Sequence, residues 1–237
     1  MVVKTPLGVQ YRRFTVDEYH RIIDLAILPE DLPVELIDGE VVVKGEYRSA
    51  PYRGTALIER YPFSRSELRR LRAAGLLSPT DVVEQRDVEE WPAMTIGDPH
   101  CECVDLLNSV LTLALAGVAR VRVQNPVVLD TSDPEPDVSV VRRRSYRAGK
   151  PQSADVYLLV EVADTSLDYD RNVKGPLYAR NGIPEYWIID LNSDTVLVHR
   201  GPRPDGTWAT TDPRRRGDTL DLAALPGVSV PVADVLP

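Results

Sequence analysis

Three charged residues in the second half of the chain stand where chemistry is possible: Asp137, Glu161 and Lys174. Glu161 interrupts the aliphatic run "LLVEVA" at 158–163, which is typical of a strand buried on both faces. A carboxylate there destabilises the fold unless a positive charge or a metal ion neutralises it. Asp137 opens a second strand-like run, "PDVSVV" at 136–141, and Lys174 precedes a helical segment.

Neighbouring strands would bring Asp137 and Glu161 within a few ångströms, where each carboxylate raises the pKa of the other. A divalent cation removes this repulsion, and magnesium prefers carboxylate oxygens together with water. Such an ion activates water and stabilises negative charge on a pentacovalent phosphate. Lys174 would add a compact positive charge beside the scissile phosphate or the attacking water. The three residues therefore indicate metal-dependent hydrolysis of phosphodiesters.

A structural interpretation stays open for each of these residues. Asp137 follows Pro136 and could cap a turn. Glu161 could form a plain ion pair with a buried arginine or with Lys174, and Lys174 could lie on the surface. The loop residues Asp168 and Asp170 could orient Lys174, but capping of the helix is the favoured interpretation. These alternatives are as compatible with the residue types as a metal site is.

Two further residues near this segment have simpler interpretations. Arg171 belongs to the same loop and is assigned, with its neighbours, to helix capping. Tyr178 is interpreted as core packing, although it lies one helical turn beyond Lys174.

Alternating helical and strand-like segments around these residues predict a mixed α/β fold. A helix over residues 98–117 is expected to begin with Asp98 as its cap and Pro99 in its first turn. A later helix over residues 176–181 is expected to have Pro176 in its first turn or to be kinked there. We expect one domain over residues 1–237, with the catalytic core at 98–200. The expected core segments are a helix at 98–117, strands at 121–130, 136–141 and 156–163, a helix at 176–181, and strands at 185–190 and 195–200.

The N-terminal part contains a repeated pattern 49 residues apart, at 14–42 and 63–91. Phe14 matches Phe63 and Glu18 matches Glu67 without a gap. In each copy a Ser or Thr precedes the Glu by three residues, which is the capping box of a helix start. We interpret the two segments as an internal duplication of a helix–strand unit.

Composition limits the function classes. The net charge of −8 argues against a histone-like coat, although it permits an enzyme with a local basic patch. The basic clusters at 142–144 and 214–216 are interpreted as solvated loops rather than phosphate contacts. Cys101 and Cys103 form neither a disulfide framework nor a zinc pattern. With no apolar run near the length of a membrane span and no signal-peptide core, we expect a cytoplasmic protein.

Several segments taken together resemble the Uma-type family of restriction-like endonucleases in the PD-(D/E)XK superfamily. They are "PEPDVSVV", then "LLVEVADTSLDYDRNVKGPLYARNGIPEYWIIDL", and the N-terminal "FTVDEYHRIIDLAILPEDLPVELIDGEVV". The resemblance covers nearly the whole chain apart from the second copy of the repeat. It implies a restriction-endonuclease-like core, a mixed β-sheet flanked by helices, with a magnesium- or manganese-dependent phosphodiesterase site.

The same resemblance assigns roles to residues. Asp137 matches the aspartate of the family's "PD" motif, and Glu161 matches the acidic residue of the next strand. The usual lysine position, two residues after that acid, is Ala163 here, and Lys174 from the following helix takes its role. The chain then resembles a metal-dependent endonuclease that hydrolyses DNA and acts as a homodimer.

Three more residues are assigned from the resemblance. Glu35, in "VELIDGE", matches a family glutamate that would help Asp137 and Glu161 to hold the metal. Glu84 is its equivalent in the second copy, but that copy lacks the turn glycine, so Glu35 is favoured. His100 matches a family histidine that would contact phosphate or water, or begin the helix.

Two alternatives to a DNA endonuclease remain. One is a catalytically silent nucleic-acid-binding or scaffolding protein on a nuclease fold, since a fold does not fix a function. The other is a phosphodiesterase that acts on RNA or a small substrate.

Overall fold

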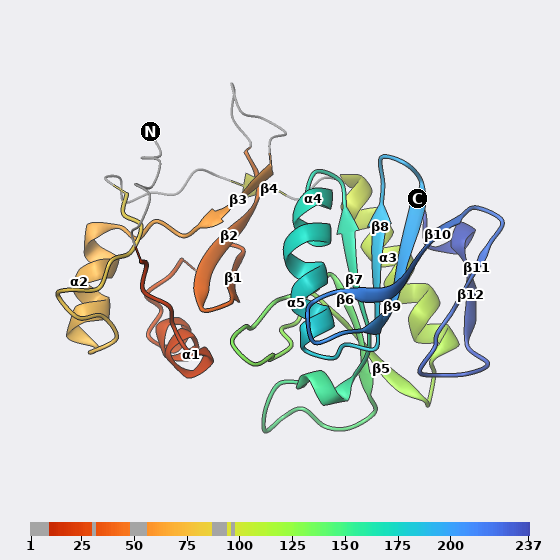
Figure 1. Cartoon of the computed structure of the whole chain (residues 1–237), viewed down its shortest axis with the longest axis horizontal. Helices are drawn as coiled ribbons and strands as arrows, with labels where there is room; N and C mark the ends of the chain where they lie inside the picture. The colour runs from red at the N-terminus through yellow and green to blue at the C-terminus, as the bar shows by residue number, and fades with distance from the viewer. Residues whose placement is uncertain (1–9, 30–31, 48–55, 87–93, 96–97) are drawn as a thin grey trace. The chain divides into compact units, whose positions relative to one another are not determined.

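The computed structural model describes residues 10–29, 32–47, 56–86, 94–95 and 98–237, with no side-chain detail for 44–47, 56–59 and 94–95. The chain divides into two compact units, coloured along the sequence in Figure 1. The first unit comprises Met1–Thr95 and Thr131–Asp133, and the second comprises Ile96–Asp130 and Pro134–Pro237. No helix among the described residues is long and apolar enough to cross a lipid bilayer.

The second unit is built on a six-stranded mixed sheet with the order β10-β9-β8-β7-β6-β5. Only β7 and β8 are parallel, and every other neighbouring pair is antiparallel. The expected mixed α/β class is therefore confirmed. The strands are β5 (Ala119–Val123), β6 (Val138–Arg142), β7 (Val156–Ala163), β8 (Glu185–Asp190), β9 (Thr195–Pro202) and β10 (Trp208–Arg215), and β11 (Thr219–Asp221) pairs separately with β12 (Ser229–Pro231).

Helix α3 (Asp98–Ala114) covers one face of this sheet. Its apolar stripe, which includes Leu107 and Leu111, packs on Val138, Val140 and the alternate residues of β7. Each fully buried leucine contributes about 1.5–3 kcal/mol through removal from water. Asp98 was expected to cap this helix from outside, but it is already the first residue of α3.

A continuous helical segment connects β7 to the parallel strand β8. It consists of α4 (Leu167–Tyr169), a π-helical turn (Asp170–Lys174) and α5 (Gly175–Arg180). The helix thus begins nine residues before the predicted start at 176. Pro176 lies in the first turn of α5, where its missing N–H group is tolerated. A π-helical turn is rare and often marks a functional site.

Side chains alternate between the two faces of the sheet. Since Val138 and Val160 point to α3, their neighbours Asp137 and Glu161 point to the opposite face. That face is covered by the segment containing Lys174 and α5, which contributes a hydrogen bond and an ion pair to Glu161.

The first unit has its own core and its own antiparallel sheet. Phe14 and Phe63 meet in this core with their ring centroids 6.1 Å apart. Helices α1 (Val16–Asp24) and α2 (Arg65–Ala73) accompany the strands β1 (Val34–Ile37), β2 (Glu40–Tyr47), β3 (Ala56–Arg60) and β4 (Met94–Thr95).

The two helices of the first unit begin and end alike. Both have nine residues and a complete capping box, closed by Glu18 in α1 and by Glu67 in α2. Each is followed by a residue with positive φ, Ala26 at 49° and Gly75 at 71°. The hairpin part of the second copy extends to 91, and residues 87–91 lie outside the described part of the chain. The duplication and the single-domain organisation stay predictions.

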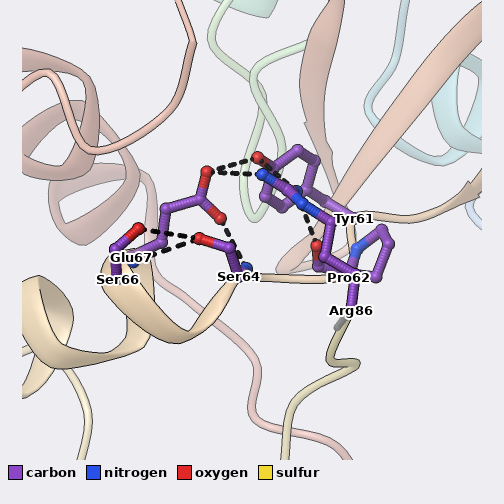
Figure 2. A network of polar contacts seen from close by, with 6 residues as sticks. All are labelled: Tyr61, Pro62, Ser64, Ser66, Glu67 and Arg86. Atoms are coloured by element: carbon purple, nitrogen blue, oxygen red, sulfur yellow. Dashed lines mark hydrogen bonds and ion pairs between the residues drawn. The ribbon is translucent and has the colours of Figure 1, made fainter. Parts of the chain in front are cut away.

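Figure 2 shows the polar network that surrounds Glu67. Its Oε1 accepts hydrogen bonds from the Tyr61 hydroxyl (2.8 Å) and from Arg86 Nη2 (2.9 Å), while its Oε2 accepts one from the Ser64 N–H (2.7 Å). Burial raises the pKa of the Tyr61 hydroxyl. The network therefore joins the start of α2 to the segment at Arg86, across 19 residues of chain.

Candidate active site

The pairing of β6 with β7 places Asp137 beside Glu161. The register pairs Val138 with Val160, so one further step sets Asp137 opposite Glu161. Directly opposite residues of antiparallel strands share a face, with Cβ atoms about 4.5–5.5 Å apart. The backbone N–H of Val162 donates to Asp137 Oδ2 at 2.8 Å, which fixes this carboxylate at the end of the strand pair.

Glu161 is fully buried and is held by two donors. Lys174 Nζ donates to Glu161 Oε1 at 2.8 Å, and the Tyr178 hydroxyl donates to the same oxygen at 2.7 Å. Both Glu161 and Lys174 are 0% exposed. The ammonium group therefore neutralises the carboxylate in the interior, where an uncompensated charge would be strongly unfavourable.

The π-helical turn brings Lys174 to this position, and Asp170 stabilises the turn. Ser166 Oγ donates to Asp170 Oδ2 at 2.6 Å, and the Tyr186 hydroxyl donates to the carbonyl oxygen of Asp170 at 3.2 Å. Asp170 is buried, whereas Asp168 and Arg171 are exposed. Asp170 thus fixes the backbone that carries Lys174, a role that sequence reasoning ranked below capping.

His100 lies against the other carboxylate. Its Nε2 atom is 3.1 Å from Asp137 Oδ2, and its side chain comes from the first turn of α3. The structure therefore places His100 beside Asp137, and its expected contact with phosphate or water stays a prediction.

Cys103 lies one turn of α3 beyond His100 and is buried. Its Sγ donates to the carbonyl oxygen of Val235 at 3.2 Å. Burial, with a smaller effect of the Asp137 charge, raises the pKa of the Cys103 thiol to about 12. Cys103 is therefore a neutral thiol at ordinary pH and contributes no thiolate ligand.

Tyr178 is the site residue that sequence reasoning assigned to the core alone. It is fully buried and packs edge-to-face on Tyr186, with centroids 4.9 Å apart. Its hydroxyl, however, is directed at Glu161. The signal in the sequence was its spacing of four residues from Lys174, which places both side chains on one face of a helix.

Glu35 and Glu84 belong to the first compact unit, while Asp137, Glu161 and Lys174 belong to the second. Glu35 is buried in β1, and Glu84 is half-buried with its carbonyl oxygen accepting the Phe63 N–H at 2.8 Å. Their roles toward a metal ion therefore stay predictions.

The donor set of the second unit fits a hard divalent cation. Asp137 and Glu161 supply carboxylate oxygens from adjacent strands, and magnesium is commonly bound by one or two carboxylates plus water. Carboxylate and water also suit manganese. Within the described ranges, no cluster of three or more His, Cys, Asp or Glu side chains is arranged to hold a metal.

Comparison with known proteins places the chain in a family. The model of the Uma2 family, described as "Putative restriction endonuclease", matches residues 87–233, well over half of the chain. The fold is similar to the crystal structure of "a putative nuclease belonging to DUF820" from Anabaena variabilis ATCC 29413, with a TM-score of 0.57. That similarity covers 94% of this chain and 97% of the other at 16% identity, so it shows the fold alone. No curated protein matches the chain. On the family match, the chain belongs to the Uma2 family of restriction-endonuclease-like proteins.

Proposed function

We propose that the protein is a metal-dependent nuclease that hydrolyses phosphodiester bonds of DNA. Magnesium or manganese would be held by Asp137 and Glu161, with Glu35, or Glu84 in its place, completing the ligand set. The observation that carries the proposal is the buried Glu161–Lys174 pair, 2.8 Å apart, on the strand next to Asp137. Two acids and an ammonium group in one buried cluster match the demands of phosphoryl chemistry.

Each residue of the cluster has a distinct task in this proposal. A bound divalent ion would act as a Lewis acid and lower the pKa of a bound water. Asp137 and Glu161 would hold the ion, and Lys174 would supply positive charge for the phosphate oxygens on which negative charge develops. Tyr178 and His100 orient the two carboxylates through their contacts with Glu161 and Asp137. Water attacks phosphorus in line, without a covalent intermediate on the protein.

DNA and a homodimer complete the proposal. The family description, a restriction endonuclease, supports a nucleic-acid substrate. Two copies of one chain related by a two-fold axis can each cut one strand of a duplex, which makes a symmetric dimer the natural assembly.

A second candidate is a catalytically silent nucleic-acid-binding protein on the same fold. The observation that favours it is the direct contact of Lys174 with Glu161, since a purely structural ion pair has the same geometry. In that case the cluster stabilises the second unit, and the substitution of its acids changes stability without affecting any chemistry.

Plasmid cleavage by the full chain separates the two candidates. Supercoiled DNA is incubated with the protein and magnesium, manganese or EDTA, and nicked and linear products are resolved on a gel. Asp137→Asn keeps the shape of the side chain and removes its charge. Lys150→Met is the matched control for Lys174→Met, because Lys150 lies in the loop after β6 and outside the cluster.

The nuclease proposal predicts cleavage only with a divalent metal, loss of cleavage in Asp137→Asn and Lys174→Met, and retention in Lys150→Met. Circular dichroism confirms that each variant is folded. Absence of cleavage by the wild-type protein with both metals, together with metal-independent DNA binding, would establish the silent candidate instead.

A further inference from the structure

Three guanidinium groups gather around one aromatic ring at the edge of the second unit's sheet. The Cζ atoms of Arg120, Arg122 and Arg144 lie 6.0, 5.6 and 5.0 Å from the centroid of the Tyr146 ring. Arg120 and Arg122 come from β5, the edge strand of the sheet, and the other two come from the loop after β6. We call these four residues the Tyr146 cluster.

The positive charge of the Tyr146 cluster is only partly compensated. Arg144 pairs with Asp155 at 2.5 Å, and Arg122 Nη2 donates to the neutral Asn125 side chain at 3.1 Å. Among the residues that the structure describes, Arg120 and Arg122 have no carboxylate within 4.0 Å. Burial and the neighbouring Arg120 lower the pKa of Arg122. The protein thus holds like charges together although its net charge is −8.

Further basic side chains extend this surface. Arg142 at the end of β6 is exposed, as are Arg143 and Arg147 in the following loop, and Arg142 Cζ lies 5.5 Å from the centroid of the Tyr157 ring. Cation–π contacts hold arginines in place without neutralising them. The result is an ordered positive surface, which differs from a loop of freely solvated charges.

The strand register puts part of this surface on the same side of the sheet as the candidate active site. Arg122 is paired with Ser139 and Arg120 with Val141. Ser139 and Val141 are two and four residues from Asp137, and alternate residues of a strand share a face. At about 3.3 Å per residue, the positions of Arg122 and Arg120 lie about 7 and 13 Å from Asp137, measured along β6.

This spacing suits a nucleic-acid strand that passes the site. With a rise of about 3.4 Å per nucleotide, 7 and 13 Å correspond to about two and four nucleotides. Guanidinium groups bind phosphate through two parallel hydrogen bonds, and they are less strongly hydrated than ammonium groups. The Tyr146 ring is already in contact with guanidinium groups, so it orders the arginines and is not offered to a base.

We propose that the Tyr146 cluster binds the phosphate backbone of nucleic acid, two to four nucleotides (about 7–13 Å) from the phosphate at Asp137. Contacts to phosphate carry no base information, so this binding is independent of sequence. The identity of the partner rests on the proposed function. For Arg144 the proposal differs from the expectation that the arginines at 142–144 form a solvated loop.

The test measures binding without cleavage. A fluorescein-labelled DNA duplex is titrated with the full chain in EDTA, and anisotropy gives Kd over a series of salt concentrations. The variant is Arg120→Gln/Arg122→Gln, and the control is Arg214→Gln/Arg215→Gln, which removes the same charge from β10 at the opposite edge of the sheet.

The cluster variant should bind about tenfold more weakly at low salt, and the slope of log Kd against log salt should fall by about two, one for each lost phosphate contact. The control should retain most of its affinity. Equal affinity and slope in the cluster variant and the wild type would overturn the proposal. So would a wild-type protein that binds polyglutamate, a polyanion without phosphate groups, but does not bind DNA.

Cleavage assays on the same proteins keep the two proposals distinguishable. If the wild type binds DNA through the cluster but never cleaves it with metal, the nuclease proposal fails and the cluster stands. If the cluster variant binds and cleaves like the wild type, the cluster proposal fails and the nuclease stands.

Discussion

Replacement of Lys174 by methionine tests how much the second unit depends on the buried ion pair. Lys174 and Glu161 are both 0% exposed, so the variant leaves a carboxylate in the interior without its ammonium partner. Breaking a buried pair on one side costs about 3–5 kcal/mol. The Tyr178 hydroxyl still donates to Glu161, which favours the lower end of this range. Against a total stability of about 5–15 kcal/mol, a loss of about 3 kcal/mol is large.

Urea unfolding at neutral pH measures this loss. Trp187 and Trp208 belong to the second unit, and replacing the third tryptophan, Trp91, by phenylalanine makes tryptophan fluorescence report on the unit that holds the pair. With a slope of about 2 kcal/mol per molar urea, the midpoint should fall by about 1.5 M. Far-ultraviolet circular dichroism shows whether the first unit unfolds in the same transition.

The double variant Lys174→Met/Glu161→Gln supplies the control. Glutamine is neutral and can still accept the Tyr178 hydroxyl, so the double variant should recover more than half of the lost stability. Glu161→Gln alone leaves the ammonium group buried without its partner and should also cost about 3 kcal/mol, so the loss in the double variant should be well below the sum of the two single losses. The double variant should still fail to cleave DNA, which separates the loss of chemistry from the loss of stability. If Lys174→Met is as stable as the wild type, or the two substitutions are additive, the ion-pair reasoning is refuted.

Three further predictions concern single groups. Tyr178→Phe removes one donor to Glu161 and should weaken magnesium binding about 10- to 100-fold by calorimetry, and unchanged affinity would contradict the orienting role. In the native protein iodoacetamide should modify the exposed Cys101 and spare Cys103, whose buried thiol has its pKa raised to about 12; mass spectrometry that finds both modified would contradict this. Burial lowers the pKa of His199, so the unfolded chain binds a proton that the folded chain does not, and stability should fall as pH drops below about 6.5. His199→Phe should flatten that fall in urea midpoints, and an unchanged pH dependence would rule out His199 as its source.

The sequence was informative where one local pattern determined the geometry. Asp137 and Glu161 lie side by side because they are opposite each other on two paired strands, where side chains alternate between the faces of the sheet. The apolar pattern of the two strands is visible in the sequence. Lys174 reaches Glu161 because the helix begins early, at Leu167, and passes through a π-helical turn. Pro176 concealed this start, since a proline usually marks the first turn of a helix.

Features that depend on distant segments could not be predicted in the same way. Arg120 and Arg122 alternate with valines as on any half-exposed strand, and nothing local connects them with Tyr146, 24 residues from Arg122. Tyr178 was predicted to pack in the core, which it does, but the contact of its hydroxyl with Glu161 was not predicted. Glu35 belongs to the first compact unit, and its role toward a metal ion stays a prediction.

The two outer strands of the six-stranded sheet have a consequence for self-association. An outer strand offers unpaired backbone groups to which another chain can add a strand, and charged side chains discourage this. β5 carries Arg120 and Arg122, and β10 carries Arg214 and Arg215. Two copies joined through either strand would bring like charges together. Self-association through β5 or β10 is therefore disfavoured, and neutralisation of these arginines should increase aggregation.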